Sequence, residues 1–429
     1  MPVYGTIILA ALVVALGVEL AVDQLNLRAL SPEVPREFRD VYDPERYRRA
    51  QDYLRARTRF GMLGASLDLA VVLAFWLTGG FAALDGALRR LGLASVPTGL
   101  LFIGILGLGR VLLALPLRWW STFVIEARFG FNRTTSRTFW TDLAKALLLS
   151  LALGGPLLAA ILWLLTVAGG RAWLWCWLAS ATVALVVQFI APAWLMPLFN
   201  RFAPLPEGGL RDAILAYARS VAFPLAGVFV IDGSRRSTKA NALFTGFGRH
   251  KRVALFDTLV EKLDAAEVVA VVAHEIGHYK CRHVIQGMLL GIAQLGLTFF
   301  LLSLVLDRRA LFEAFYLPEP SVHAGLVFFA LLLTPLELVV SPLLHALSRR
   351  NESEADAFAA ATTGAGEVLA RGLERLSADS LANLTPHPLY VLLHYSHPPL
   401  LERVRALGGR HPAAAETAAS GHHARPAPE

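Results

Sequence analysis

The stretch Val268-Val-Ala-Val-Val-Ala-His274-Glu275-Ile-Gly-His278-Tyr-Lys280 contains the chemistry that the rest of the chain has to support. Its apolar run followed by polar residues predicts a helix, and His274 and His278 project from one face of that helix. Two histidines at this spacing can hold one zinc ion, and a glutamate beside the first can take a proton from the attacking water. We therefore predict His274 and His278 as zinc ligands and Glu275 as the general base of a metalloprotease.

This motif also occurs by chance, because it fixes only three positions. The alternative interpretation is a helix with incidental polar residues. The strongly apolar run 268–273 argues against that alternative, since two imidazoles and a carboxylate on a buried helix are costly without a bound partner.

A second acidic stretch offers the third ligand that a catalytic zinc requires. In Arg349-Arg-Asn-Glu352-Ser-Glu354-Ala-Asp356, Glu352 and Asp356 share one helix face, and Glu354 points elsewhere. One of the pair can bind zinc while the other hydrogen-bonds a ligating imidazole, and spacing alone does not decide which. Without the histidine motif, a solvated acidic helix start would be the better interpretation.

The composition is that of a membrane protein. Hydrophobic residues make up 55% of the 429 residues and charged residues 17%, with a mean hydropathy of +0.52. The apolar residues form long blocks, and a block of about 20 residues can cross a bilayer as a helix. Seven blocks qualify as predicted spans: 3–22, 60–80, 94–117, 145–168, 172–197, 284–306 and 322–346.

The net charge of +7 does not indicate nucleic acid binding, because the arginines lie mainly in loops between apolar blocks. Loops 23–59 and 118–144 are the most basic, and basic loops favour the cytoplasmic side. This orientation places the N-terminus outside and the segments 198–283 and 347–409 inside. We expect those two segments to fold together as one cytoplasm-facing protease domain.

The predicted organisation has five parts: spans one to five in 1–197, the first protease segment in 198–283, spans six and seven in 284–346, the second protease segment in 347–409, and a disordered tail in 410–429. Charged residues lie inside the predicted spans at Asp68, Arg110 and Glu337, and an unpaired charge there is expensive. We hypothesise that Asp68 and Arg110 pair with each other.

Further motifs, together with the two metal motifs, resemble one family over residues 30–409. They are Ser121-Thr-Phe-Val-Ile-Glu-Ala-Arg-Phe-Gly-Phe-Asn132, Pro197-Leu-Phe-Asn-Arg-Phe202, Ser237-Thr-Lys-Ala-Asn-Ala-Leu-Phe-Thr-Gly-Phe247 and Leu393-His-Tyr-Ser-His-Pro-Pro-Leu-Leu-Glu-Arg403. The chain resembles the type I CAAX prenyl proteases, gluzincin-type integral membrane zinc endopeptidases that process isoprenylated proteins and are related to the HtpX group.

The resemblance assigns roles that spacing leaves open. It implies that Glu352 is the third zinc ligand and that Asp356 orients a ligating histidine. It implies that His397 and Arg403 contact the scissile peptide and stabilise the developing oxyanion, a task for hydrogen-bond donors. The alternatives are a turn residue for His397 and a surface cation for Arg403.

The resemblance also implies a substrate-binding edge strand at Asn241, Ala242, Leu243 and Phe244, against which the substrate backbone pairs. His283 and His394 receive no role from it, and we interpret both as structural.

The predicted fold is mainly α: a seven-span bundle enclosing a chamber, with a gluzincin-like zinc protease domain that contains a small β edge. We expect one zinc ion per chain, a peptide or protein substrate with or without an isoprenyl group, contact with a lipid bilayer, no nucleic acid and a monomer. The Ala-, Arg- and Leu-rich composition favours a bacterial inner membrane over the endoplasmic reticulum.

Two alternatives concern function. One is a quality-control protease like the HtpX group, which differs in substrate more than in fold. The other is a metal-dependent sensor that no longer cleaves, against which the intact Glu275 argues.

Overall fold

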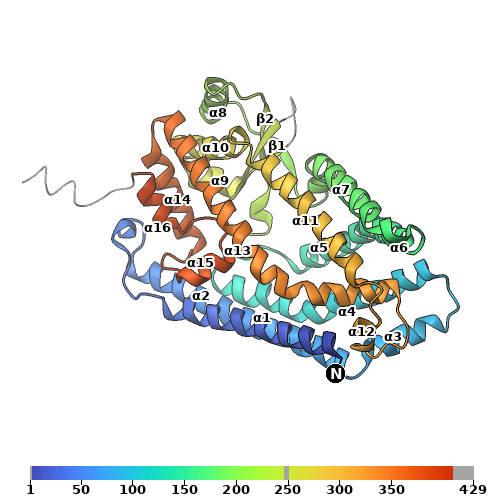
Figure 1. The fold of residues 1–429 in the computed structure, drawn as a ribbon. Coiled ribbons are helices and arrows are strands. Elements are labelled where there is room, and N and C mark those ends of the chain that lie inside the picture. Colours follow the sequence, from blue (N-terminus) through green and yellow to red (C-terminus); the bar gives the residue numbers. More distant parts are fainter. Residues whose placement is uncertain (1, 246–250, 409–429) are drawn as a thin grey trace, which may run out of the picture.

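Seven helices long and apolar enough to cross a membrane dominate the computed structural model, which describes residues 2–245 and 251–408 (Figure 1). They cover Val3–Arg28, Pro44–Leu77, Ser95–Glu126, Ser136–Val167, Gly169–Leu198, His283–Val305 and Val322–Thr363. The predicted mainly helical, seven-span fold is therefore confirmed. The tail expected at 410–429 lies outside the described residues.

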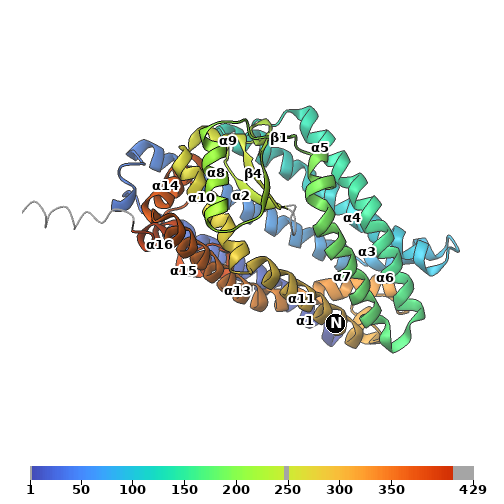
Figure 2. The ribbon, with the colours of Figure 1, turned by 90° about the horizontal axis from the view of Figure 1, so that it is seen from above.

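The seven spanning segments contain eight longer α-helices. These helices are α1 (Val3–Arg28), α2 (Pro44–Leu77), α4 (Ser95–Trp120), α5 (Ser136–Leu149), α6 (Gly155–Val167), α7 (Ala172–Ile190), α11 (His283–Val305) and α13 (Val322–Thr363). There are eight because α5 and α6 are joined by a π-helical turn into one span, and two other spans also continue into π-helical turns. The short helices α3 (Gly80–Arg89) and α12 (Arg309–Glu313) lie between consecutive spans. Figure 2 shows α11 and α13 on one side of the bundle and α4 to α7 on the other.

Two helices extend well beyond the apolar blocks from which they were predicted. The helix α2 begins at Pro44, where the Asp43 side chain accepts a hydrogen bond from the backbone N–H of Arg46 at 2.7 Å. The loop expected at 23–59 is therefore short, because hydropathy identifies only the part of a helix that faces lipid. A capped, polar first turn is stable in water and leaves no hydropathy signal.

The helix α13 continues through the expected boundary between 346 and 347. It has 42 residues, about 63 Å along its path at 1.5 Å per residue, and contains Pro335 and Pro342. Prolines inside a helix remove backbone donors and permit bends. One continuous helix thus carries both the last membrane span and the second acidic motif.

A small mixed sheet lies among the remaining helices. Its strands are β1 (Phe202–Pro204), β2 (Leu225–Ile231), β3 (Ala242–Thr245) and β4 (Lys251–Phe256). Their spatial order is β1-β2-β4-β3, with β2 parallel to β4 and both outer strands antiparallel to their neighbours. Among the strands of residues 2–245 and 251–408, β3 pairs with β4 alone, so the predicted β edge is an edge strand.

The surrounding helices are α8 (Gly209–Ser220), α9 (Asp257–Lys262), α10 (Ala265–Lys280), α14 (Gly366–Ser380), α15 (Pro388–His394) and α16 (Leu400–Ala406). The hydrophobic core shared by α8, α9, α10, α14 and α16 also includes aromatic side chains from the N-terminal half, among them Tyr42, Tyr47, Tyr53 and Phe129. Burial of one large apolar side chain stabilises a fold by about 1.5–3 kcal/mol. The start of α2 therefore belongs to the core of the protease segments, although it precedes the second span in sequence.

Buried polar contacts join the same two halves. The guanidinium of Arg236 donates to both carboxylate oxygens of Asp142 at 2.8 and 3.0 Å and to the carbonyl of Phe199 at 2.7 Å. The ammonium of Lys239 lies 3.2 Å from Glu126 and donates to the Tyr53 hydroxyl at 2.8 Å. These residues fix the segment before β3 to the ends of the membrane helices.

The hypothesised intramembrane ion pair is present. Arg110 Nη2 of α4 donates to Asp68 Oδ2 of α2 at 3.0 Å, so these two charges are partners of opposite sign.

We expect Asp68→Ala and Arg110→Ala each to lower the thermal unfolding temperature in detergent, because each leaves one unpaired charge in a span. The double variant should lose less than the sum of the two single losses. If Arg110→Ala is harmless while Asp68→Ala matches the double variant, the pairing has no energetic role.

Candidate metal centre and active site

The helix α10 is held in place at its start by a capping box. The Asp264 side chain accepts from the backbone N–H of Glu267 at 2.9 Å, and the Glu267 carboxylate accepts from the backbone N–H of Asp264 at 3.1 Å. Glu267 is fully buried and also accepts from Arg375 of α14 at 2.9 Å. Because these contacts fix the first turn, the buried side of α10 has a single orientation toward α13.

A close approach of α10 to α13 brings the two metal motifs together. A Cβ at Gly277 would lie 3.1 Å from both the Cα and the carbonyl oxygen of Ala355. These atoms belong to the backbone of α13, so a methyl group at this position would require the two helices to separate by a few tenths of an ångström, and glycine avoids this. Ala355 lies between Glu352 and Asp356, and both acidic side chains face α10.

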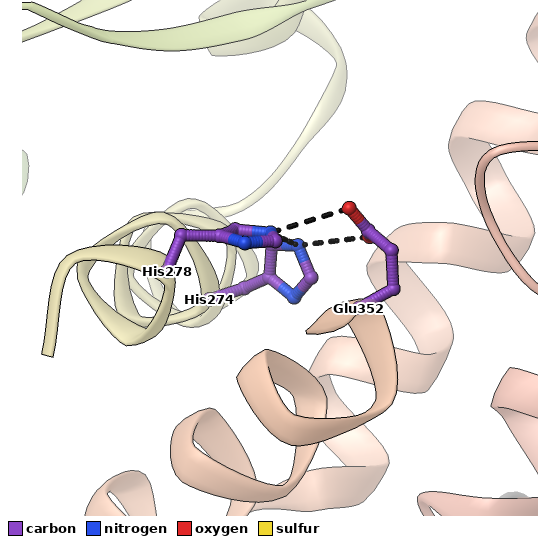
Figure 3. A group of neighbouring side chains, drawn as sticks. All are labelled: His274, His278 and Glu352. Atoms are coloured by element: carbon purple, nitrogen blue, oxygen red, sulfur yellow. Dashed lines mark hydrogen bonds and ion pairs between the residues drawn. The ribbon is translucent and has the colours of Figure 1, made fainter. Parts of the chain in front are cut away.

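The two imidazoles and one carboxylate converge on a single point (Figure 3). The Nε2 atoms of His274 and His278 are 3.2 Å apart. Glu352 Oε2 lies 3.4 Å from the first of these nitrogens, and Glu352 Oε1 lies 3.3 Å from the second. His274 and Glu352 are buried, while His278 is partly exposed toward a cavity.

These separations fit a tetrahedral zinc ion. Ligand atoms about 2.0–2.1 Å from a tetrahedrally coordinated zinc lie about 3.3–3.4 Å from one another. In addition, Glu352 is buried, and each of its two carboxylate oxygens faces the Nε2 atom of one of the two histidines. Two neutral nitrogens and one carboxylate are the donor set of a catalytic zinc with one open position.

Asp356 holds the first histidine, as the resemblance implies. Its Oδ1 lies 2.7 Å from His274 Nδ1, and its two oxygens accept from Arg403 Nε and Nη2 at 2.8 and 2.7 Å. Burial alone would raise the pKa of Asp356, but its hydrogen bonds with His274 and Arg403 lower that pKa. The carboxylate therefore stays ionised and orients the imidazole.

The same carboxylates act on His274. Burial would lower the pKa of His274, but the hydrogen bonds with Asp356 and Glu352 outweigh burial and raise the pKa to about 9. Without metal, this imidazole keeps a proton at neutral pH, and a metal ion must displace that proton.

The candidate general base and the candidate oxyanion donors surround the same point. Glu275 is mostly buried, and burial raises its pKa. His397 Nδ1 lies 2.8 Å from Glu352 Oε2, with 60% of its side chain exposed. Arg403 is 12% exposed, and its Nη1 lies 3.9 Å from Glu352 Oε2. His397 and Arg403 thus lie beside the candidate metal site, but one edge of the Arg403 guanidinium is hydrogen-bonded to Asp356.

The edge strand and the metal site open into one cavity of about 800 Å³. Ala242, Leu243 and Phe244 line this cavity together with Glu275 and His278. Asn241 precedes the strand, and its backbone carbonyl accepts from the N–H of Phe256 at 3.0 Å. The predicted strand segment therefore lies beside the predicted catalytic residues.

One contact was missed by the sequence analysis. His283, interpreted there as structural, lies with Nδ1 3.1 Å from His278 Nδ1, and its Nε2 lies 3.1 Å from Glu354 Oε2. Each zinc-binding histidine needs a partner for its second nitrogen. The need of His278 Nδ1 for a hydrogen-bond partner is the signal from which a nearby polar residue such as His283 could have been predicted.

Comparison with known proteins places this geometry in a family. Residues 23–201 match the family described as CAAX prenyl protease N-terminal, five membrane helices, and residues 204–411 match peptidase family M48. The chain is 36% identical over 400 residues to a CAAX prenyl protease 1 homolog of Arabidopsis thaliana, with 91% of this chain and 94% of the relative covered. The chain belongs to the CAAX prenyl protease 1 family.

Other relatives agree. CAAX prenyl protease 1 of Saccharomyces cerevisiae is 34% identical over 401 residues, covering 87% of this chain and 88% of that protein. The crystal structure of S. mikatae Ste24p superimposes with a TM-score of 0.90 at 32% identity, covering 95% of this chain and 99% of that one. The protein is therefore a multi-pass membrane M48 zinc metallopeptidase, which confirms the predicted enzyme class. These relatives are eukaryotic and give no support to the expected bacterial inner membrane.

We expect zinc affinity to rise with pH, because His274 releases its proton when the metal binds. Below a pKa of about 9 the apparent affinity should strengthen about tenfold per pH unit for one displaced proton. Chelator competition in detergent at several pH values measures this slope. Asp356→Asn, which removes one carboxylate that raises the pKa, should give a flatter dependence, and equal slopes would contradict the assignment.

We expect Gly277→Ala to weaken zinc binding and to destabilise the protein by about 1–3 kcal/mol, because its Cβ overpacks against the α13 backbone. Gly86→Ala in α3 is the matched control, since its Cβ would meet no atom within 4 Å. Thermal unfolding with and without zinc measures both effects. An unchanged zinc response in Gly277→Ala would show that the helices do not need this approach.

Proposed function

We propose that this protease cleaves peptide bonds near the C-terminus of isoprenylated protein substrates. The observation that supports this proposal most directly is the shape of the space beside the metal site. The cavity that contains Glu275 and His278 continues into an apolar groove between two membrane helices. A substrate can therefore place a peptide at the metal and a hydrocarbon in the groove at the same time.

The groove lies between α7 and α11 and has a volume of about 560 Å³. Small residues line it on both helices, including Ala181 and Ala184 on α7 and Gly287 and Gly291 on α11. It shares Gln188, His283, Val284, Gly287 and Gly291 with the larger cavity. Among its described lining residues there is no lysine, arginine, aspartate or glutamate, so its surroundings suit a flexible apolar chain.

The peptide portion has a separate binding element. As an edge strand, β3 has unpaired backbone groups on the side away from β4, and an extended peptide can pair with them by β-augmentation. We propose that Asn241, Ala242, Leu243 and Phe244 bind substrate in this way. Backbone pairing reads the extended shape of a peptide, which allows variation in its side chains.

Three side chains are proposed to carry the reaction. Zinc bound by His274, His278 and Glu352 supplies a Lewis acid that makes water a stronger nucleophile. Glu275 takes the proton of the attacking water and returns it to the leaving amine. His397 donates a hydrogen bond to the oxygen of the former carbonyl.

The third side chain is Arg403, which we propose adds positive charge beside that oxygen while its other edge holds Asp356. In a partly buried site, charge placed beforehand stabilises the developing oxyanion more strongly than water does.

We further propose that the catalytic residues face the cytoplasm. Arg46 at the start of α2 donates to the carbonyl of Ala378, and the backbone N–H of Arg133 after α4 donates to the carbonyl of Arg236. Both basic segments therefore contact the protease segments, and basic loops favour the cytoplasmic side. The segments 198–283 and 347–409 then act as one catalytic unit joined to the bundle. We propose that a monomer suffices, since one chain supplies every group named above, and that nucleic acid is not a partner.

The decisive experiment compares a farnesylated peptide with the same peptide lacking the lipid, using purified protein in detergent. We expect zinc-dependent cleavage of the farnesylated peptide, and its loss by a factor on the order of 10³ or more in Glu275→Ala. Equal cleavage of both peptides would favour the quality-control alternative. Zinc binding without any cleavage would favour the sensor alternative.

A second variant tests the groove itself. Gly291→Phe should reduce kcat/KM more for the farnesylated peptide than for the plain peptide, because its ring enters the groove, where a Cβ meets no atom within 4 Å, although Gly291 also borders the larger cavity. Gly107→Phe on α4 is the matched control, since Gly107 is equally open and lies outside both cavities. Equal losses for the two peptides would exclude the groove as the hydrocarbon site.

A further inference from the structure

The turn between α10 and α11 brings a third histidine back onto the metal site. The helix α10 ends at Lys280, and Arg282 has a left-handed backbone with φ of 63° before α11 begins at His283. A left-handed conformation is uncommon for a residue with a branched or long side chain and needs support from its surroundings. The result is that the His283 side chain is only 6% exposed and faces His278.

The contacts of His283 form a chain with one consistent set of proton positions. Glu354 can only accept, so the His283 Nε2 that lies 3.1 Å from its Oε2 carries a proton. In the neutral ring, Nδ1 of His283 is then an acceptor. It lies 3.1 Å from Nδ1 of His278, which must donate. The remaining nitrogen of His278, Nε2, then has its lone pair free for the metal.

This chain parallels the one on the other ligand. His274 Nδ1 meets Asp356, whose carboxylate is held by Arg403. His278 Nδ1 meets His283, whose partner Glu354 accepts from Arg350 Nε at 2.9 Å. Each ligating imidazole thus has an acceptor on its outer nitrogen, and each acceptor is held by a further residue. The difference is that the second chain contains an imidazole ring in place of a buried carboxylate.

We propose that His283, oriented by Glu354, is a positioning residue that fixes the tautomer and ring orientation of the zinc ligand His278. This inference rests on the proposed assignment of His274, His278 and Glu352 as ligands. His283 acts through His278 and takes no part in bond breaking. Loss of such an outer partner typically costs about 10–100-fold in metal affinity.

The test compares two substitutions at one position. His283→Leu fills a similar volume but offers no acceptor, whereas His283→Asn can place an amide oxygen where Nδ1 lies. We expect zinc affinity, measured by chelator competition, to fall about 10–100-fold in His283→Leu and to stay within about threefold in His283→Asn. Glu354→Ala should cause a smaller loss, because His283 keeps its place but loses its orientation. His394→Leu, an exposed histidine on α15, is the control and should bind zinc normally.

A spectroscopic measurement separates positioning from packing. We expect the visible absorption of the cobalt-substituted protein to change in His283→Leu and to be restored in His283→Asn, because this absorption reports ligand geometry. The inference is overturned if His283→Leu binds zinc like the wild type. It is also overturned if both variants lose affinity equally and unfold at the same lowered temperature without zinc, since that pattern indicates packing alone.

Failure of the ligand assignment gives a different result. His278→Ala should abolish tight zinc binding whatever the role of His283. Retained tight binding in His278→Ala would refute the proposed metal site, whereas normal binding in His283→Leu alone would refute only the positioning role.

Discussion

The close contact between α10 and α13 is the constraint on which the rest of the site depends. Neither helix carries the complete candidate metal site, because two of the proposed ligands lie on α10 and the third lies on α13. If α10 and α13 were farther apart by the size of one methyl group, Glu352 would lie too far from both imidazoles to share a metal ion with them. Gly277 permits the contact, and the capping box at Asp264 and Glu267 holds α10 in the matching orientation. The chemistry is therefore a consequence of backbone packing.

The same contact explains why the protease segments are interrupted by membrane helices in the sequence. The helix α13 enters the site from a membrane span, and α11 leaves the site directly into another. The early aromatic residues of α2 complete the core around them. A soluble protease domain and a separate anchor would leave the position of the third ligand undetermined. Here the bundle itself determines it.

The sequence allowed confident prediction wherever one physical signal dominates. Apolar length predicted seven spans, and helical spacing predicted that His274 and His278 share one helix face and that Glu352 and Asp356 share another. The position of Arg403 on Asp356 and of His283 on His278 was not predicted, because both depend on how distant turns fold back. A left-handed residue such as Arg282 leaves no pattern in a single sequence. The polar start of α2 was also missed, because its burial depends on residues that follow much later in the chain.

The unbroken course of α13 also has a geometric consequence for how deep cleavage occurs. From residue 346, where the last apolar run ends, to Glu352 the helix advances about 9 Å along its axis. This part of α13 therefore fixes the distance between the end of the apolar run and the candidate metal site. We expect cleavage only of bonds that reach the candidate metal site at that distance from the end of the apolar run. Distance from the lipid, in addition to sequence, would then decide which proteins this enzyme can shorten.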